Sequence, residues 1–154
     1  ANSALGVVIA CASLPDDVAD LLLRTQNDLF DVGADLCTPV VAAPAYPPLR
    51  VEPDYVERLE RACDTYNEQL EKLGSFVLPG GTAAAAHLHV ARTVVRRAER
   101  STWAALATHE SEMNPLTAQY LNRLSDLLFI LSRVANLPSN GGSGDVLWRP
   151  GGER

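Results

Sequence analysis

Four arginines occur within nine residues of an otherwise acidic chain, in the stretch RTVVRRAER that begins at Arg92. On a helix, Arg92, Arg96 and Arg100 share one face, because each step of four residues turns about 40° and rises about 6 Å. Glu99 falls on the same face, whereas Arg97 points away. Forked guanidinium groups suit a polyphosphate, so this face predicts an anion-binding surface. A solvated face on which Arg96 pairs with Glu99 is the alternative.

A second face combines polar side chains with one aromatic ring. Asn122, Asp126, Phe129 and Arg133 lie at i, i+4, i+7 and i+11, which places them within about 60° of each other on a helix. A phenylalanine in a polar stripe indicates a ligand surface or an interface. A single exposed aromatic side chain is the alternative.

Other candidate sites are weaker. His87 and His89 are two residues apart and would point about 200° away from each other on a helix, so they cannot chelate one metal. His109 has no nucleophile beside it. The glycines at 80–81 and 141–144 lack the pattern of a phosphate-binding loop.

The apolar residues recur at helical and heptad spacing, which predicts an all-α antiparallel bundle of five helices in a single domain, residues 1–154. A proline-rich crossover follows the second helix. A connector precedes the fourth helix, and Thr82 at its end is expected to cap that helix. Residues 145–150 are expected to dock on the bundle. The five helices are expected at about 2–13, 15–37, 53–73, 83–107 and 115–136.

Composition narrows the class of protein. The chain has 13 basic and 19 acidic residues, and its net charge of −6 disfavours binding to nucleic acid. No apolar run approaches the roughly 18 residues that span a membrane. Cys11, Cys37 and Cys63 form no CxxC pair, so we expect buried free thiols in a cytoplasmic protein.

Three motifs resemble, in order and in spacing, those of PduO-type ATP:cob(I)alamin adenosyltransferases. They are FVLPGG from Phe76, RTVVRRAER from Arg92 and LNRLSDLLF from Leu121, and the opening NSALG from Asn2 resembles the segment after the family's Asp-Glu-Leu. The resemblance implies a homotrimer with one active site at each subunit interface. It also implies attack by cob(I)alamin on the 5′-carbon of ATP, with release of triphosphate.

The resemblance assigns roles to residues at the nucleotide. It implies that Arg96 contacts the ATP phosphates, that Glu99 places Mg²⁺–ATP as the metal ligand, and that Asn122 also binds ATP. Arg100 belongs to the same nucleotide-binding face. Arg92 is expected to pair with an aspartate across the subunit interface and to hold the site together.

The resemblance also implies a corrin pocket. Phe76 is expected beneath the corrin ring, where it displaces the lower axial base and leaves a four-coordinate cobalt(II) that is easier to reduce. Phe129 is expected to line the same pocket, and Trp148 to close over the corrin. A cobalt reductase and an adenosylcobalamin-dependent mutase are the further partners that the resemblance implies.

One departure from the family pattern concerns the start of the chain. The family's Thr-Gly-Asp-x-Gly-x-Thr segment, its nearby lysine and the aspartate for Arg92 are absent from these 154 residues, and the sequence opens inside a helical pattern. We therefore expect an ATP-binding segment to precede it. Two rival classes remain: a ferritin-like metalloprotein, for which only His109 and Glu112 offer nearby ligands, and a non-catalytic helical interaction protein.

Overall fold

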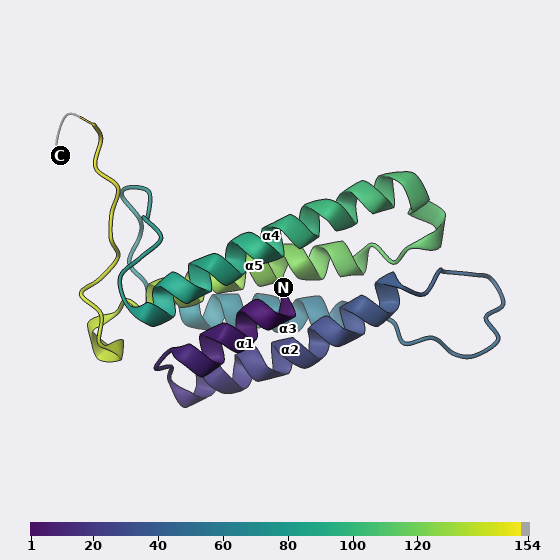
Figure 1. Ribbon diagram of the computed structural model, residues 1–154, viewed down its shortest axis with the longest axis horizontal. Helices are drawn as coiled ribbons and strands as arrows, with labels where there is room; N and C mark the ends of the chain where they lie inside the picture. Colours follow the sequence, from purple (N-terminus) through teal and green to yellow (C-terminus); the bar gives the residue numbers. More distant parts are fainter. Residues whose placement is uncertain (152–154) are drawn as a thin grey trace.

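A computed structural model describes residues 1–151 and places most of them in helices (Figure 1). In that range there is no strand, and the sole β feature is an isolated antiparallel bridge between Val77 and Leu147. None of the helices described is long and apolar enough to cross a membrane. The helices are α1 (Asn2–Cys11), α2 (Asp16–Leu36), α3 (Pro53–Asn67), α4 (Ala83–His109) and α5 (Leu116–Val134), with short 3-10 turns at Glu110–Glu112 and Pro138–Asn140.

Consecutive helices run antiparallel, as predicted, whereas the packed neighbours α3 and α5 run in the same direction (Figure 1). Helix α4 packs closely on α5, and α1 packs against both α2 and α4. The connector, residues 68–82, and the tail, residues 145–148, lie together at one end of the bundle. The crossover, residues 38–50, and the turn between α4 and α5 lie at the other end.

Small and branched side chains make the contact between α4 and α5 possible. Ala84, Leu88, Ala91 and Val95 form a buried stripe on α4 at spacings of four, three and four residues. Helix α5, which packs on α4, contributes leucines to the same core, and Leu124 is fully buried. Because the alanines let the two backbones approach closely, polar side chains at the edge of this contact can reach across it.

Helix α3 ends at Asn67, so the prediction that it continues to about residue 73 is wrong. The heptad spacing continues through Leu73, but this side chain is 41% exposed and is not part of the core. The main chain turns instead, with the amide of Leu70 donating to the carbonyl of Asn67 at 3.0 Å. Arg133 of α5 then donates to the carbonyl of Glu71 at 2.7 Å, which holds the connector in its non-helical path.

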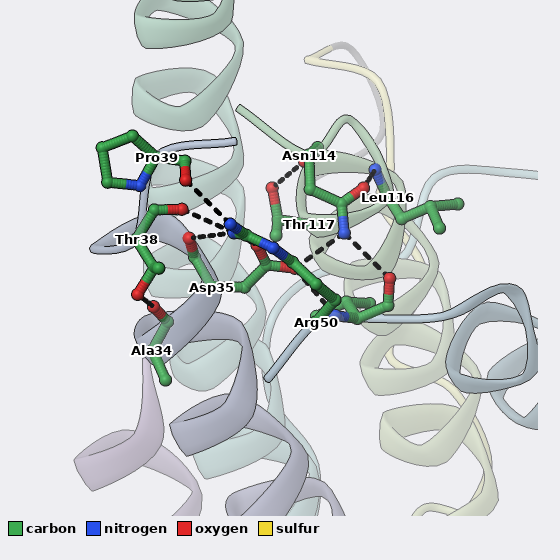
Figure 2. A network of polar contacts seen from close by, with 9 residues as sticks. Ala34, Asp35, Thr38, Pro39, Arg50, Asn114, Leu116 and Thr117 are labelled. Atoms are coloured by element: carbon green, nitrogen blue, oxygen red, sulfur yellow. Dashed lines mark hydrogen bonds and ion pairs between the residues drawn. The ribbon is translucent and has the colours of Figure 1, made fainter. Parts of the chain in front are cut away.

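A buried carboxylate fixes both ends of the crossover (Figure 2). Asp35, near the end of α2, accepts from Arg50 at 2.5 Å, from the amide of Val51 at 2.7 Å and from the side chain of Asn114 at 2.7 Å. Arg50 also donates to the carbonyl of Thr38 at 2.5 Å. One charged residue therefore ties α2, the start of α3 and the turn before α5 together.

The start of α4 is fixed in a similar way. Thr82 caps the helix as predicted, its hydroxyl accepting from the amide of Ala85 at 3.1 Å. The buried side chain of Asn136 donates to the carbonyl of Gly80 at 3.0 Å and accepts from the amide of Thr82 at 2.9 Å. Gly81 has φ of 102°, and a Cβ there would lie 2.2 Å from the Asn136 Oδ1 atom, so this position requires glycine.

The expectation of buried thiols is wrong for two of the three cysteines. Cys11 and Cys37 are exposed because they lie where α1 and α2 end, and Cys63 is half-buried. All three are free thiols, as predicted. Burial raises the pKa of the Cys63 thiol to about 11, which keeps it protonated.

Candidate active site

Three of the predicted site residues meet where α4 faces α5. The Glu99 carboxylate is buried, with its side chain 6% exposed, and each of its oxygens has a partner. Arg96 donates to Oε2 at 2.5 Å from one turn earlier on α4, and Asn122 of α5 donates to Oε1 at 2.9 Å. The pairing of Arg96 with Glu99 that was the alternative is therefore present, but its carboxylate is buried rather than solvated.

This cluster can receive an anion. Arg96 is 46% exposed, and a guanidinium has five N–H donors, so it can donate to phosphate oxygens while it remains bound to Glu99. Glu99 and Asn122 hold the guanidinium in place before a ligand arrives. Such fixed donors stabilise developing negative charge better than mobile donors do.

The same cluster offers little to a bare metal ion. No group of three or more His, Cys, Asp or Glu side chains within the described part of the chain could hold one. Glu99 contributes a single carboxylate, which is typical of Mg²⁺ that is bound mainly by substrate phosphates and water. The residues thus fit a Mg²⁺ ion carried by a polyphosphate, and they do not form a protein cage.

Arg92 lies one turn before Arg96 and contacts an aromatic ring. Its guanidinium carbon is 4.9 Å from the ring centre of Phe129, in a cation–π arrangement. Among the side chains that the structure describes, no carboxylate forms an ion pair with Arg92. Arg100 is exposed on the same helix and makes no side-chain hydrogen bond to another described residue.

His89 also contacts Phe129 and was not among the predicted site residues. It is 4% exposed, and its ring packs edge-on against Phe129 with centroids 6.2 Å apart. Burial lowers the pKa of His89, the positive charge of Arg92 lowers it further, and Asp145 opposes both effects. The imidazole is therefore neutral at pH 7, and its Nε2 atom has no hydrogen-bond partner in the described residues.

Phe76 and Trp148 form an aromatic pair at the end of the bundle. Their ring centroids are 6.0 Å apart at an interplanar angle of 71°, and the rings are on exposed residues. The backbone amide of Trp148 donates to the carbonyl of Phe76 at 2.7 Å, so the tail docks as predicted. Phe129 contacts His89 and Arg92 instead of this pair, and its place in the same pocket stays a prediction.

Sequence reasoning missed two residues that organise this end of the bundle. Asn136 joins the connector to the end of α5, and Asp145 pairs with Arg133 at 2.8 Å. Asn136 lies beyond the periodic part of α5, so no helical spacing indicated it. The signal for Asp145 was its place in a short tail that was expected to dock.

A pocket of about 470 Å³ lies between α2 and α4, towards the crossover end of the bundle. Cys37, Thr102 and His109 are among the residues that line it. None of the predicted site residues does. The pocket is therefore separate from the arginine face and from the aromatic pair.

Comparison with known proteins agrees with this arrangement. Residues 1–135 match the model of the family described as cobalamin adenosyltransferase. A corrinoid adenosyltransferase from Mycobacterium tuberculosis is 58% identical over 154 residues, covering 100% of this chain and 77% of that protein. The corrinoid adenosyltransferase of Bacillus subtilis is 39% identical over 148 residues, covering 94% of this chain and 72% of that protein.

A solved structure extends the similarity to the fold. It is a phenylalanine-to-alanine variant of the PduO-type ATP:corrinoid adenosyltransferase from Lactobacillus reuteri, complexed with cobalamin and ATP. The two structures agree with a TM-score of 0.85 at 32% identity, covering 96% of this chain and 80% of that chain. This chain belongs to the cobalamin adenosyltransferase family.

Proposed function

We propose that this chain transfers the 5′-deoxyadenosyl group of ATP to cob(I)alamin, forming adenosylcobalamin and triphosphate. The observation that carries this proposal is the cluster of Arg96, Glu99 and Asn122, in which residues from two family motifs meet around one buried carboxylate. Membership of the family supports the same activity over that of a non-catalytic interaction protein. The corrinoid adenosyltransferases named above match 100% and 94% of this chain.

The reaction is a substitution at carbon. The cobalt(I) electron pair attacks the 5′-carbon of ATP, a cobalt–carbon bond forms, and the carbon–oxygen bond breaks with its electrons leaving on triphosphate. The leaving group gains negative charge as the bond breaks. Arg96, fixed by Glu99, is placed to donate to that charge, and Asn122 binds the nucleotide beside it.

Mg²⁺ is part of the substrate in this proposal. When it is bound to the phosphates, it neutralises part of the charge of the triphosphate. Glu99 is the carboxylate that would orient Mg²⁺–ATP, and Arg100 on the same face adds positive charge. Exposure of Arg100 leaves its guanidinium free to meet the nucleotide.

The aromatic pair supports the second half of the site. Phe76 is 77% exposed on a connector that is fixed at both ends, so its ring presents a flat apolar surface. We place the corrin against the ring of Phe76, which displaces the lower axial base. Trp148 lies beside this ring. Phe129 extends the apolar surface towards Arg92.

A homotrimer completes the proposal. Arg92 is half-buried and pairs with none of the carboxylates that the structure describes, and an aspartate from another subunit would explain this. We also propose a single domain, a cytoplasmic location, and a cobalt reductase and an adenosylcobalamin-dependent mutase as partners. Light scattering of the protein in solution tests the trimer directly.

An anaerobic assay tests the activity. The full-length protein is mixed with reduced cobalamin and Mg²⁺–ATP, and cobalt–carbon bond formation is followed by absorbance. Adenosylcobalamin and triphosphate are expected in equal amounts. If neither turnover nor ATP binding occurs, the protein is a non-catalytic bundle.

A further inference from the structure

The last turn of α5 carries a buried arginine that the proposed chemistry does not use. Arg133 is 8% exposed, and its guanidinium reaches two segments that are far apart in sequence. Its Nε atom donates to the Oδ2 atom of Asp145 in the tail at 2.8 Å. Its Nη2 atom donates to the carbonyl of Glu71 in the connector at 2.7 Å. One side chain from the rigid bundle therefore holds both segments.

These two segments present the aromatic pair. The two segments are also joined to each other by a short ladder of hydrogen bonds. The amide of Trp148 donates to the carbonyl of Phe76, and the amide of Leu78 donates to the carbonyl of Val146 at 2.7 Å. The hydroxyl of Ser75 donates to the carbonyl of Trp148 at 2.9 Å. A two-stranded pairing of this size is marginally stable in water without other support.

The ion pair supplies that support. The side chains of Arg133 and Asp145 are 9% and 15% exposed, and their donor and acceptor atoms are 2.8 Å apart. A charge-assisted hydrogen bond with little solvent is strong, and removal of one partner leaves the other charge buried and uncompensated. The second oxygen of Asp145, Oδ1, has no partner in the described residues, so Arg133 is the group that stabilises this carboxylate.

We infer that Arg133 and Asp145 are positioning residues for the corrin surface, because they fix the tail against the connector and so set the place of Trp148 beside Phe76. This inference rests on the proposed function, in which these two rings meet the corrin. Neither Arg133 nor Asp145 touches substrate. Their action is confined to the end of the bundle where the aromatic pair lies.

A selective effect on one substrate follows. The nucleotide cluster is held by its own side-chain hydrogen bonds between α4 and α5, and none of them involves the tail. Loss of the ion pair should therefore weaken binding of cobalamin and leave binding of ATP unchanged. A general loss of structure would change both.

The test uses Asp145→Asn, which keeps the shape of the side chain and removes its charge. Glu57→Gln is the matched control, because it removes a carboxylate from an exposed ion pair with Arg61 on α3. Hydrogen exchange of the Leu78 and Trp148 amides is measured without ligand, and the KM values for cobalamin and ATP are measured anaerobically. Arg133→Lys, which keeps the charge but not the fork, is the conservative variant.

In Asp145→Asn, we expect exchange of these two amides to accelerate by about tenfold or more, with exchange in α4 and α5 unchanged. We expect the KM for cobalamin to rise by about tenfold and that for ATP to stay within about twofold of wild type. Arg133→Lys should lie between wild type and Asp145→Asn in both measurements, and Glu57→Gln should match wild type.

Two results would overturn the inference. Unchanged exchange in Asp145→Asn would show that the ion pair does not hold the tail. Faster exchange with an unchanged KM for cobalamin would show that the tail has no part in binding the corrin. An inactive wild-type protein would instead contradict the proposed function, and exchange would still report whether the ion pair holds the tail.

Discussion

Arg96 donates to Glu99 from one turn earlier on α4, and Glu99 is the buried member of the pair. The carboxylate thus fixes the guanidinium while leaving it accessible to a ligand. Asn122 occupies the second oxygen and prevents the carboxylate from turning away. The arrangement supplies an oriented positive charge at the surface of a net acidic protein.

Replacement of Arg96 tests this arrangement. Arg96→Ala should lower kcat by about 10²- to 10³-fold, because the leaving triphosphate loses an oriented donor. Arg96→Lys should recover part of the rate, since an ammonium keeps the charge without the planar fork. Arg97→Ala is the control on the exposed side of the same turn and should behave as wild type. Equal rates for the Arg96 and Arg97 variants would remove Arg96 from the phosphate site.

Replacement of Phe76 tests the corrin surface. Phe76→Ala removes the exposed ring and should abolish the spectrum of four-coordinate cobalt(II) that forms on the protein with ATP, because the lower axial base is no longer displaced. The oligomeric state by light scattering should not change. Tyr46→Ala, at an equally exposed aromatic in the crossover, is the control. A wild-type spectrum in Phe76→Ala would contradict the role of this ring.

Two adjacent glycines differ sharply in what they tolerate. Gly81→Ala should destabilise the protein by about 2–4 kcal/mol, because a Cβ would strain the backbone and collide with Asn136. Gly80→Ala is the matched control, since nothing lies within 4 Å of its Cβ position. Urea unfolding, followed by circular dichroism, measures both. Similar losses in the two variants would show that the contact with Asn136 is not the cause.

The clamp on the crossover is also testable by unfolding. Asp35→Asn removes the charge that pairs with Arg50 inside the protein, and we expect a loss of about 3 kcal/mol in the free energy of unfolding. Asp20→Asn, at an exposed position on α2, should change stability by less than about 0.5 kcal/mol. An Asp35→Asn protein as stable as Asp20→Asn would show that the ion pair adds no net stability.

His89 should make the protein sensitive to acid. Its pKa in the folded protein lies below the ordinary value of 6.5, so below pH 6.5 the unfolded chain binds a proton that the folded chain does not. The free energy of unfolding should therefore fall as the pH falls through 6.5. His89→Gln should reduce this slope, because the group that resists protonation in the folded protein is removed. Equal slopes in wild type and His89→Gln would contradict the prediction.

The helices could be predicted because their apolar spacing and caps are local signals. Thr82 begins α4 in the structure as in the sequence. The end of α3 could not be predicted, because the apolar spacing continues through Leu73. A hydrogen bond from Arg133 to the carbonyl of Glu71 holds the chain in its non-helical path. The local sequence pattern does not indicate which backbone groups a distant side chain will bind.

The candidate site divides in the same way. The arginine face and Asn122 follow from helical spacing, and the structure brings Arg96, Glu99 and Asn122 together. For His89 the sequence indicated only that it cannot share a metal ion with His87, because its burial against Phe129 depends on how α4 and α5 meet. Asn136 binds Thr82 at a sequence separation of 54, and Asp145 binds Arg133 of another element. No single stretch of sequence contains that information.

The crossover is closed at its base by Asp35, Arg50 and Asn114, and between its ends the chain extends away from the bundle (Figure 1). A loop whose ends are held independently can change in length at little cost, since each doubling of a flexible loop adds only about 0.6 kcal/mol of closure entropy. Insertions near the exposed Tyr46 should therefore be tolerated. The crossover should accept an inserted affinity tag or fluorophore, because its length does not affect how the five helices pack.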